Sequence, residues 1–243
     1  MEISILLAEQ ILAMFLTMAV GFGVVRAGLF KTEDSRIISN MVVYICNPCV
    51  VVHSFQIELT DDKIKGLMIA IGLSVVVHMV LIIGSEILSF IFHFNSIEKA
   101  SIIYTNAGYL VIPLVGAVLG EEWVFYTTAF ILVQTVLMWT HGVKLIGQEK
   151  ELNIRKILCN PNVIAMIIGI ALFALEIRLP TVVDSCVSGF GDMISPASMM
   201  VIGMVIGDVD LKWVFRQKRP YLICLLRLIV FPLIAVVAFA GLE

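Results

Sequence analysis

The chain has 243 residues, of which 60% are hydrophobic and 14% are charged, and its mean hydropathy is +1.04. Soluble domains contain about half apolar and about one quarter charged residues, so this composition excludes a soluble globular protein and indicates an integral membrane protein. The formal net charge of -3 comes without a basic stripe, which argues against a nucleic-acid partner and leaves the lipid bilayer as the expected surroundings.

Apolar runs separated by charged or turn-forming segments predict eight helices of an all-α, polytopic membrane protein. The sixth run is short, but Asn160 and Pro161 supply a cap and a first-turn proline, and Pro180 marks its end. We expect a single transmembrane domain over residues 1–243. The eight predicted helices lie near residues 4–25, 37–57, 66–92, 99–119, 122–146, 161–177, 184–207 and 220–241.

Lys and Arg residues are distributed unevenly over the predicted loops, with twelve in the odd-numbered loops and three in the even-numbered ones. The positive-inside rule therefore predicts a multi-pass protein of the cytoplasmic membrane with its N-terminus outside the cell. The longest basic loop, residues 147–160, separates five helices from the three that follow. Because two consecutive five-helix units enter the membrane in opposite senses, we predict an inverted repeat, with repeat one over 1–150 and an incomplete repeat two over 151–243.

The fourth predicted helix contains an amide, a glycine and a proline in the stretch that begins at Asn106. Pro113 donates no hydrogen bond and so frees the carbonyl of Tyr109, while Gly108 adds backbone freedom. Broken backbone is tolerated in hydrocarbon only where it lines a protein-enclosed or watery cavity. We therefore predict a binding site here, with a half-helix that begins near Pro113 and offers its positive end to a carboxylate. A proline kink that only shapes helix packing is the alternative.

Two further helices contain a small polar residue followed by a proline, Asn47-Pro48 in the second helix and Ser195-Pro196 in the seventh. Each pair lies in the second helix of its predicted repeat. This weak sequence similarity between the two halves of the chain supports an inverted repeat. Pro196 frees the carbonyl of Asp192, and this acidic residue is a candidate carrier of a coupling proton or sodium ion. An interfacial carboxylate that reaches water is the alternative for Asp192.

Two other ionisable residues lie inside predicted helices. His78 is near the middle of the third helix and is the second coupling-ion candidate, although a neutral histidine bonded to a neighbouring helix is the plainer interpretation. Arg227 lies about two turns inside the eighth helix. We expect its side chain to snorkel to the cytoplasmic face beside Arg219, with substrate pairing as the alternative.

An intramembrane enzyme is the less favoured class of function. A metalloprotease needs an H-E-x-x-H motif and a metal-diphosphate site needs clustered aspartates, and neither pattern occurs inside a predicted helix. Asp61 and Asp62 fall in a predicted extracellular loop. We therefore expect no catalytic residues, no metal site and no cofactor.

Three motifs, taken in their order along the chain, resemble the auxin efflux carrier family of membrane transporters. Residues 106–114 are similar to the family's N-x-G-[FY]-x-x-x-P-L stretch in helix four. Residues 160–162, followed by an Ile/Gly-rich helix, resemble the start of its second repeat. Residues 195–197, followed by an apolar run with Gly203, resemble its seventh helix. The resemblance covers essentially the whole chain.

This resemblance implies a ten-helix fold of two inverted five-helix repeats, in which helices four and nine are broken and cross near the membrane centre. It implies a secondary transporter of the efflux carrier type, which moves a small organic anion such as a dicarboxylate or an auxin-like weak acid by elevator-type alternating access. It also implies these substrate-binding candidates: Asn106, Gly108, Tyr109 and Pro113 at the helix-four break, with Asn47, Pro48, Ser195 and Pro196 beside the same cavity.

The predicted helices stop at the eighth, so we expect the last two helices of the ten to be missing. A truncated, non-transporting remnant or one subunit of a split carrier is therefore an alternative to an active transporter. Pairing of two copies into a homodimer is a further alternative that the sequence leaves open.

Overall fold

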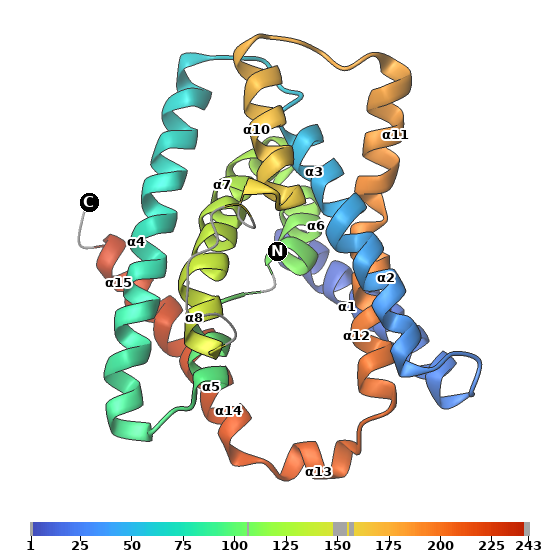
Figure 1. The fold of residues 1–243 in the computed structure, drawn as a ribbon, viewed down its shortest axis with the longest axis vertical. Coiled ribbons are helices and arrows are strands. Elements are labelled where there is room, and N and C mark those ends of the chain that lie inside the picture. Colours follow the sequence, from blue (N-terminus) through green and yellow to red (C-terminus); the bar gives the residue numbers. More distant parts are fainter. Residues whose placement is uncertain (1, 106, 148–154, 156–157, 241–243) are drawn as a thin grey trace. The chain divides into compact units, whose positions relative to one another are not determined.

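The structure is a computed structural model that describes residues 2–105, 107–147, 155 and 158–240 (Figure 1). Within these ranges the chain is all-α and contains no strand, which confirms the all-α part of the predicted fold class. Six helical segments are long and apolar enough to cross a membrane: Ile5–Arg26, Thr32–Ser54, Asp61–Phe92, Glu122–Ile146, Thr181–Gly207 and Lys218–Val236. The sixth predicted helix is a shorter apolar helix, Pro161–Ala174.

The chain divides into two compact units. Unit 1 comprises Met1–Ala70, Asn106–Leu132 and Ile154–Val209, and unit 2 comprises Ile71–Thr105, Val133–Asn153 and Asp210–Glu243. The division therefore cuts the chain between residues 105 and 106, inside the fourth predicted helix.

Unit 1 contains α1 (Glu2–Arg26), a short 3₁₀ helix (Thr32–Asp34), α2 (Ser35–Met41), a π-helix (Val42–Cys46), α3 (Asn47–Ser54), α6 (Ala107–Leu119), the first part of α7 (Glu121–Leu137), α10 (Pro161–Ala174), α11 (Thr181–Asp192) and α12 (Ile194–Gly207). The π-helix occupies the turn before Pro48, where the proline cannot donate its usual backbone hydrogen bond. The single helices predicted over 37–57 and 184–207 are thus each divided near their proline.

Glycines allow α1 and α12 to pack closely in unit 1. A Cβ atom added to Gly203 would overlap the carbonyl of Met18 in α1, and one added to Gly21 would overlap the carbonyl of Met200 in α12. Small residues at a helix contact let backbones approach and gain van der Waals contact, which drives helix association inside a membrane.

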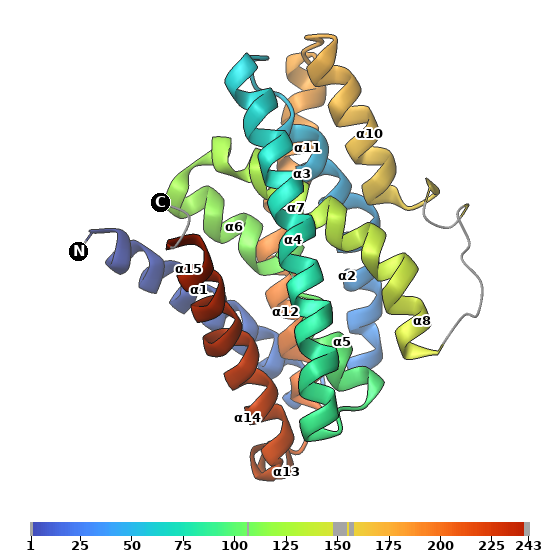
Figure 2. The same ribbon diagram turned by 90° about the vertical axis from the view of Figure 1, so that its left-hand side faces the viewer.

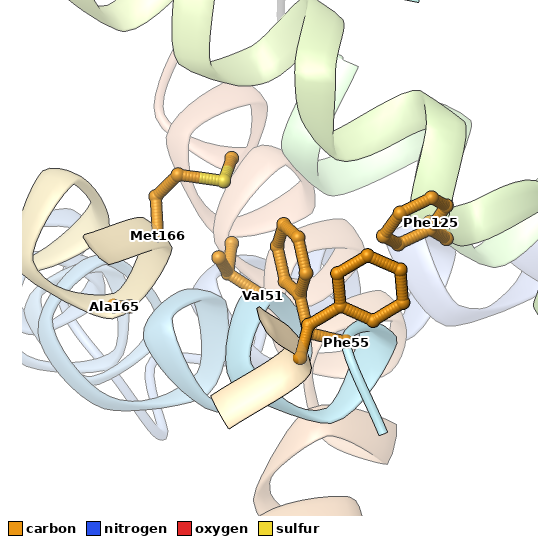
Figure 3. Close-up of a cluster of buried hydrophobic side chains, with 6 residues drawn as sticks. Val51, Phe55, Phe125, Ala165 and Met166 are labelled. Carbon is orange, nitrogen blue, oxygen red and sulfur yellow. The ribbon is translucent and has the colours of Figure 1, made fainter. Parts of the chain in front are cut away.

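Aromatic rings form the core that joins α3, α7 and α10 in unit 1 (Figure 3). Phe55 packs against Phe125 with ring centroids 5.1 Å apart and against Phe173 at 6.1 Å. Val51 and Met166 are buried beside these rings. Edge-to-face packing of this kind adds to the free energy of burial, so the cluster fixes α3 and α10 against α7.

Unit 2 contains the rest of α4 (Asp61–Phe92), α5 (Ser96–Ile103), the end of α7, a π-helix (Met138–Gly142), α8 (Val143–Ile146), α13 (Leu211–Arg216), α14 (Lys218–Leu225), a π-helix (Leu226–Val230) and α15 (Phe231–Ala240). Its core is built from Phe94, Ile102, Leu226 and Phe231. Figure 2 shows α14 and α15 following one another beside α4. The helix α13 was not predicted, although Asp210 caps it by accepting a hydrogen bond from the backbone of Lys212 at 2.9 Å.

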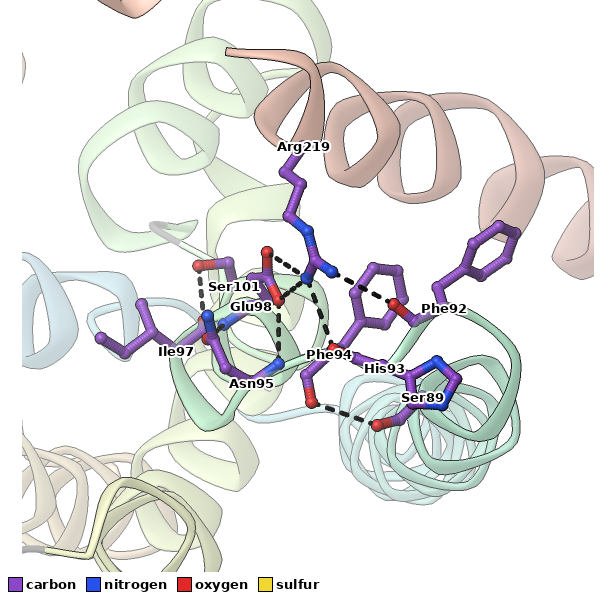
Figure 4. A network of polar contacts seen from close by, with 9 residues as sticks. All are labelled: Ser89, Phe92, His93, Phe94, Asn95, Ile97, Glu98, Ser101 and Arg219. Atoms are coloured by element: carbon purple, nitrogen blue, oxygen red, sulfur yellow. Dashed lines mark hydrogen bonds and ion pairs between the residues drawn. The ribbon is translucent and has the colours of Figure 1, made fainter.

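A polar network fixes the turn between α4 and α5 in unit 2 (Figure 4). Asn95 caps α5, because its side chain accepts a hydrogen bond from the Glu98 backbone at 2.9 Å while the Glu98 carboxylate accepts one from the Asn95 backbone at 2.8 Å. Arg219 donates to both carboxylate oxygens of Glu98, at 2.7 and 3.0 Å. Burial raises the pKa of Glu98, but the Asn95 backbone and the Arg219 guanidinium lower it more, so that this pKa lies below its ordinary value.

Candidate functional site

The fourth predicted helix is interrupted between α5 and α6. α5 ends at Ile103, Tyr104 has an extended backbone with φ −96° and ψ 131°, and α6 begins at Ala107. Asn106, the first predicted substrate contact, lies outside the described residues. The last carbonyl groups of α5 are not followed by a helical turn whose N–H groups could donate hydrogen bonds to them. Inside hydrocarbon, other groups therefore have to donate these hydrogen bonds.

The interruption lies before Gly108 and Pro113, the residues at which the sequence predicted it. Gly108, Tyr109 and Pro113 all fall inside α6, so the expectation that a half-helix begins near Pro113 is wrong. A single missing N–H deprives only the Tyr109 carbonyl of its helical donor, and a helix can continue past a proline with a kink. At Tyr104 the whole turn is replaced, which requires partners from elsewhere in the fold.

Gln134 of α7 supplies two of these partners in unit 2. Its Nε2 donates to the carbonyl of Thr105 at 2.7 Å, and its Oε1 accepts from the backbone N–H of Thr105 at 2.9 Å. Gln134 is 8% exposed, so water does not compete strongly for these bonds. Sequence reasoning missed this residue, although a buried amide in the apolar run 122–146 is a signal that could have identified it.

Arg227 holds the end of α5. Its Nη1 donates to the carbonyls of Ser101 and Tyr104, the latter at 2.6 Å. These contacts with the end of α5 were not predicted from the sequence. A helix C-terminus carries a partial negative charge, so the guanidinium is favoured at this end of α5.

His78, a predicted coupling-ion candidate, lies beside the same cluster in unit 2. It is fully buried in α4, its Nδ1 is 2.7 Å from the carbonyl of Ser74, and it also interacts with the side chain of Gln134. The hydroxyl of Tyr104 lies 3.0 Å from the carbonyl of Leu137 and 2.8 Å from Nδ1 of His141. Polar groups from α4, α7 and the π-helix before α15 thus converge on the end of α5.

A cavity of about 490 Å³ lies in unit 1 and is the second part of the candidate site. Its size is that of a small-molecule pocket. Two predicted residues line it, Asp192 at the end of α11 and Ser195 at the start of α12. The remaining lining residues come from α3, α6, α7, α11 and α12, and they are Val50, His53, Ser54, Ile112, Gly116, Ala117, Val124, Ser188, Gly191 and Ile194.

Charges of both signs surround this cavity. α3 and α11 end at it with partial negative charges beside the Asp192 carboxylate, and α12 begins at it, at Ile194, with a partial positive charge. His53 is the basic group in the wall, and its Nδ1 lies 3.0 Å from the carboxylate of Asp184. Asp192 itself forms no ion pair with the residues that the structure describes.

Asn47 and Pro48 lie elsewhere in unit 1. Asn47 is 7% exposed at the start of α3, and its Oδ1 has no hydrogen-bond partner in the described part of the chain. Pro48 lines an apolar groove of about 350 Å³ together with Pro161. The structure therefore brings Asp192 and Ser195 together at the cavity, whereas Asn47 and Pro48 are not among its lining residues. Pro196 lies within the first turn of α12, next to Ser195.

Within the described ranges, no group of three or more histidine, cysteine, aspartate or glutamate side chains is arranged to hold a metal ion. Unit 2 presents a fixed guanidinium and amide at a helix break, and unit 1 presents a carboxylate and hydroxyl groups at a cavity.

Comparison with known protein families gives one result that covers nearly the whole chain. Residues 6–153 and 148–243 match the model of a family described as membrane transport protein. No curated protein matches the chain.

Proposed function

Since the chain belongs to the membrane transport protein family, the family of the auxin efflux carriers, and is thus a transporter and not an enzyme, we propose that it is a secondary transporter of a small organic anion. The favoured substrates are dicarboxylates and auxin-like weak acids. Asn106, Gly108, Tyr109 and Pro113 are the proposed substrate contacts. Asn47, Pro48, Ser195 and Pro196 remain predictions as further contacts.

The observation that carries this proposal is the interruption of the fourth helix. Broken backbone inside a membrane protein requires replacement partners, and here Gln134 and Arg227 provide them with a net positive charge. Discontinuous helices of this kind form ion and substrate sites in secondary transporters. A preformed break with a fixed cation is suited to an anion.

We assign the coupling ion to residues other than the anion contacts. Asp192 at the cavity of unit 1 is the first candidate, because its carboxylate can take up a proton or bind a sodium ion. His78 is the second candidate, because it is a buried ionisable residue inside a membrane span. Asp192 and His78 are thus the proposed coupling residues, and the residues of the helix-four break are the main proposed anion contacts.

Transport of the elevator type agrees with the division of the chain into two compact units, since such a mechanism needs two bodies that can move as wholes. The proposed architecture is that of the family's inverted five-helix repeats, with repeat one over 1–150 and an incomplete repeat two over 151–243. The proposed location is the cytoplasmic membrane with the N-terminus outside, as the Lys and Arg distribution predicts. A homodimer is the oligomeric form to be tested.

Anion flux in proteoliposomes tests this function. Uptake of radiolabelled succinate, malate and indole-3-acetate should be saturable, and it should fall about tenfold in Asn106→Ala and in Pro113→Ala, which corresponds to about 1.4 kcal/mol. The folded yield of both variants should stay near that of the wild type. Asn40→Ala, which changes an exposed asparagine of α2, is the matched control. Unchanged flux in both variants would refute the assignment of the substrate to helix four.

A further inference from the structure

Arg227 is a charged side chain inside the apolar segment Lys218–Val236. It is half-buried, and the preceding Leu226 belongs to the hydrophobic core of unit 2. A charge within a membrane span is costly and is found where it has a partner or a function. The question is therefore what balances the charge of Arg227.

The protein balances only part of this charge. Arg227 is bonded to the carbonyls of Ser101 and Tyr104, which belong to the end of α5. A helix C-terminus carries the equivalent of about half a negative charge. About half of the positive charge is thus left without compensation from these contacts.

The acidic side chains of unit 2 do not provide the rest. In the part of unit 2 that the structure describes, the sequence contains three of them, and none forms an ion pair with Arg227. Each has another partner: Glu86 is 2.7 Å from Lys99, Glu98 is 2.7 Å from Arg219, and Asp210 caps α13.

The contacts of Arg227 leave two of its three guanidinium nitrogens without a hydrogen bond to the described residues. Both bonds to α5 are made by Nη1. Nε and Nη2 have no hydrogen bond to the described residues, and their N–H groups point to the same side of the planar group. That edge matches the two oxygens of a carboxylate.

We propose that Arg227 binds a carboxylate of the transported anion through Nε and Nη2, while its Nη1 holds the end of α5. This inference rests on the proposed function, and it deepens that function by naming the cationic group of the site. The ligand class is a small carboxylate, with a dicarboxylate leaving its second group for other contacts.

The surroundings fix Arg227 before any ligand arrives. Its two carbonyl partners are at the end of α5, and Gln134 clamps the next residue, Thr105, by two hydrogen bonds. Binding then requires little further ordering of the protein, which favours affinity. A lysine has no planar fork and could not hold α5 and a carboxylate in the same way.

The test measures succinate transport by purified full chain in proteoliposomes, with Arg227→Gln, Arg227→Lys and the control Arg36→Gln, which removes an exposed arginine of α2. In Arg227→Gln the KM for succinate should rise at least about tenfold, which is about 1.4 kcal/mol of binding, with a smaller change in the maximal rate. Arg227→Lys should recover part of the affinity. Arg36→Gln should match the wild type. The neutral diamide of succinate should not compete with succinate for the wild type.

The outcomes separate this inference from the proposed function. If the wild type transports succinate and Arg227→Gln has the same KM as the wild type, the role of Arg227 is overturned and the proposed function is not. If the wild type transports none of the carboxylate probes, both the role of Arg227 and the proposed function are overturned. If Arg227→Gln fails to fold, modification of the wild type by phenylglyoxal decides instead. Succinate should slow the modification of Arg227 at least about threefold, a free-energy difference of about 0.65 kcal/mol, and an unchanged rate would overturn the proposal.

Discussion

The two hydrogen bonds between Gln134 and the backbone of Thr105, here called the clamp, hold the break in the fourth helix. We therefore predict that a substitution of Gln134, which is distant from the break in the sequence, destabilises it. Gln134→Met keeps the side-chain length but removes both hydrogen bonds to Thr105, at 2.7 and 2.9 Å, together with the interaction with His78. The N–H and C=O of Thr105 are then left without these partners in a part-buried site. An interhelical hydrogen bond inside a membrane contributes about 0.6 to 1.7 kcal/mol, so the two bonds together are worth about 1 to 3 kcal/mol.

The assay is thermal unfolding of the detergent-solubilised protein, followed by flux of radiolabelled succinate. For a chain of this size, about 1 to 3 kcal/mol should lower the unfolding midpoint by about 2 to 12 °C, and flux should fall because the end of α5 loses its fixed position. Thr127→Val is the matched control, since it removes a hydroxyl of α7 that bonds only to its own helix at Trp123. A Gln134→Met protein that unfolds and transports like the wild type would refute the clamp.

Three further predictions concern the framework. Gly203→Leu should lower the unfolding midpoint strongly because its side chain would collide with the α1 backbone, whereas Gly189→Ala, which has open space around it, should not; Gly189→Ala unfolding as early as Gly203→Leu would contradict the close packing. Phe55→Ala should cost about 3 to 5 kcal/mol in denaturant unfolding, and Phe90→Ala, at 88% exposed, should have little effect. The pKa of Glu98 is lowered on folding, so its contribution to stability is present above the ordinary carboxyl pKa of about 4.3 and is lost as the pH falls through the lower folded value. The difference in unfolding midpoint between wild type and Glu98→Gln should therefore shrink between pH 7 and pH 3, and a constant difference would contradict it.

Composition and helix caps predicted the class of the fold because neither depends on contacts between residues that are distant in the chain. The apolar composition indicated membrane helices, and Asn160 with Pro161 marked the start of α10, where the asparagine side chain accepts from the backbone of Asn162 at 2.9 Å. Capping is a contact between near neighbours. It can therefore be read from sequence.

The position of the helix-four break depends on contacts between distant residues, and sequence reasoning placed it too late. Pro113 is a visible helix breaker, yet it lies inside α6. The break occurs at Tyr104 because Gln134 and Arg227, about 30 and 123 positions further along the chain, satisfy the backbone there. Without the fold, nothing connects these residues to the fourth helix.

The sequence predicted only some of the side chains that line the cavity of unit 1. Asp192 and Ser195 were predicted from their position beside Pro196, and both line this cavity. His53 was not singled out, although it lies in the wall and contacts Asp184 across α3 and α11. The family resemblance implied that Asn47 and Pro48 lie beside the cavity at the helix-four crossing, and in the structure Pro48 lines an apolar groove with Pro161 of α10. A shared motif does not determine which neighbour a helix face meets.

Counterflow of a labelled organic anion in proteoliposomes tests the central claim most directly. Vesicles that contain the purified chain and are preloaded with unlabelled succinate should transiently accumulate labelled succinate above the level of protein-free vesicles, and Gln134→Met should reduce that accumulation. Accumulation equal to that of protein-free vesicles for succinate, malate and indole-3-acetate alike would contradict an organic-anion transporter built around the broken fourth helix.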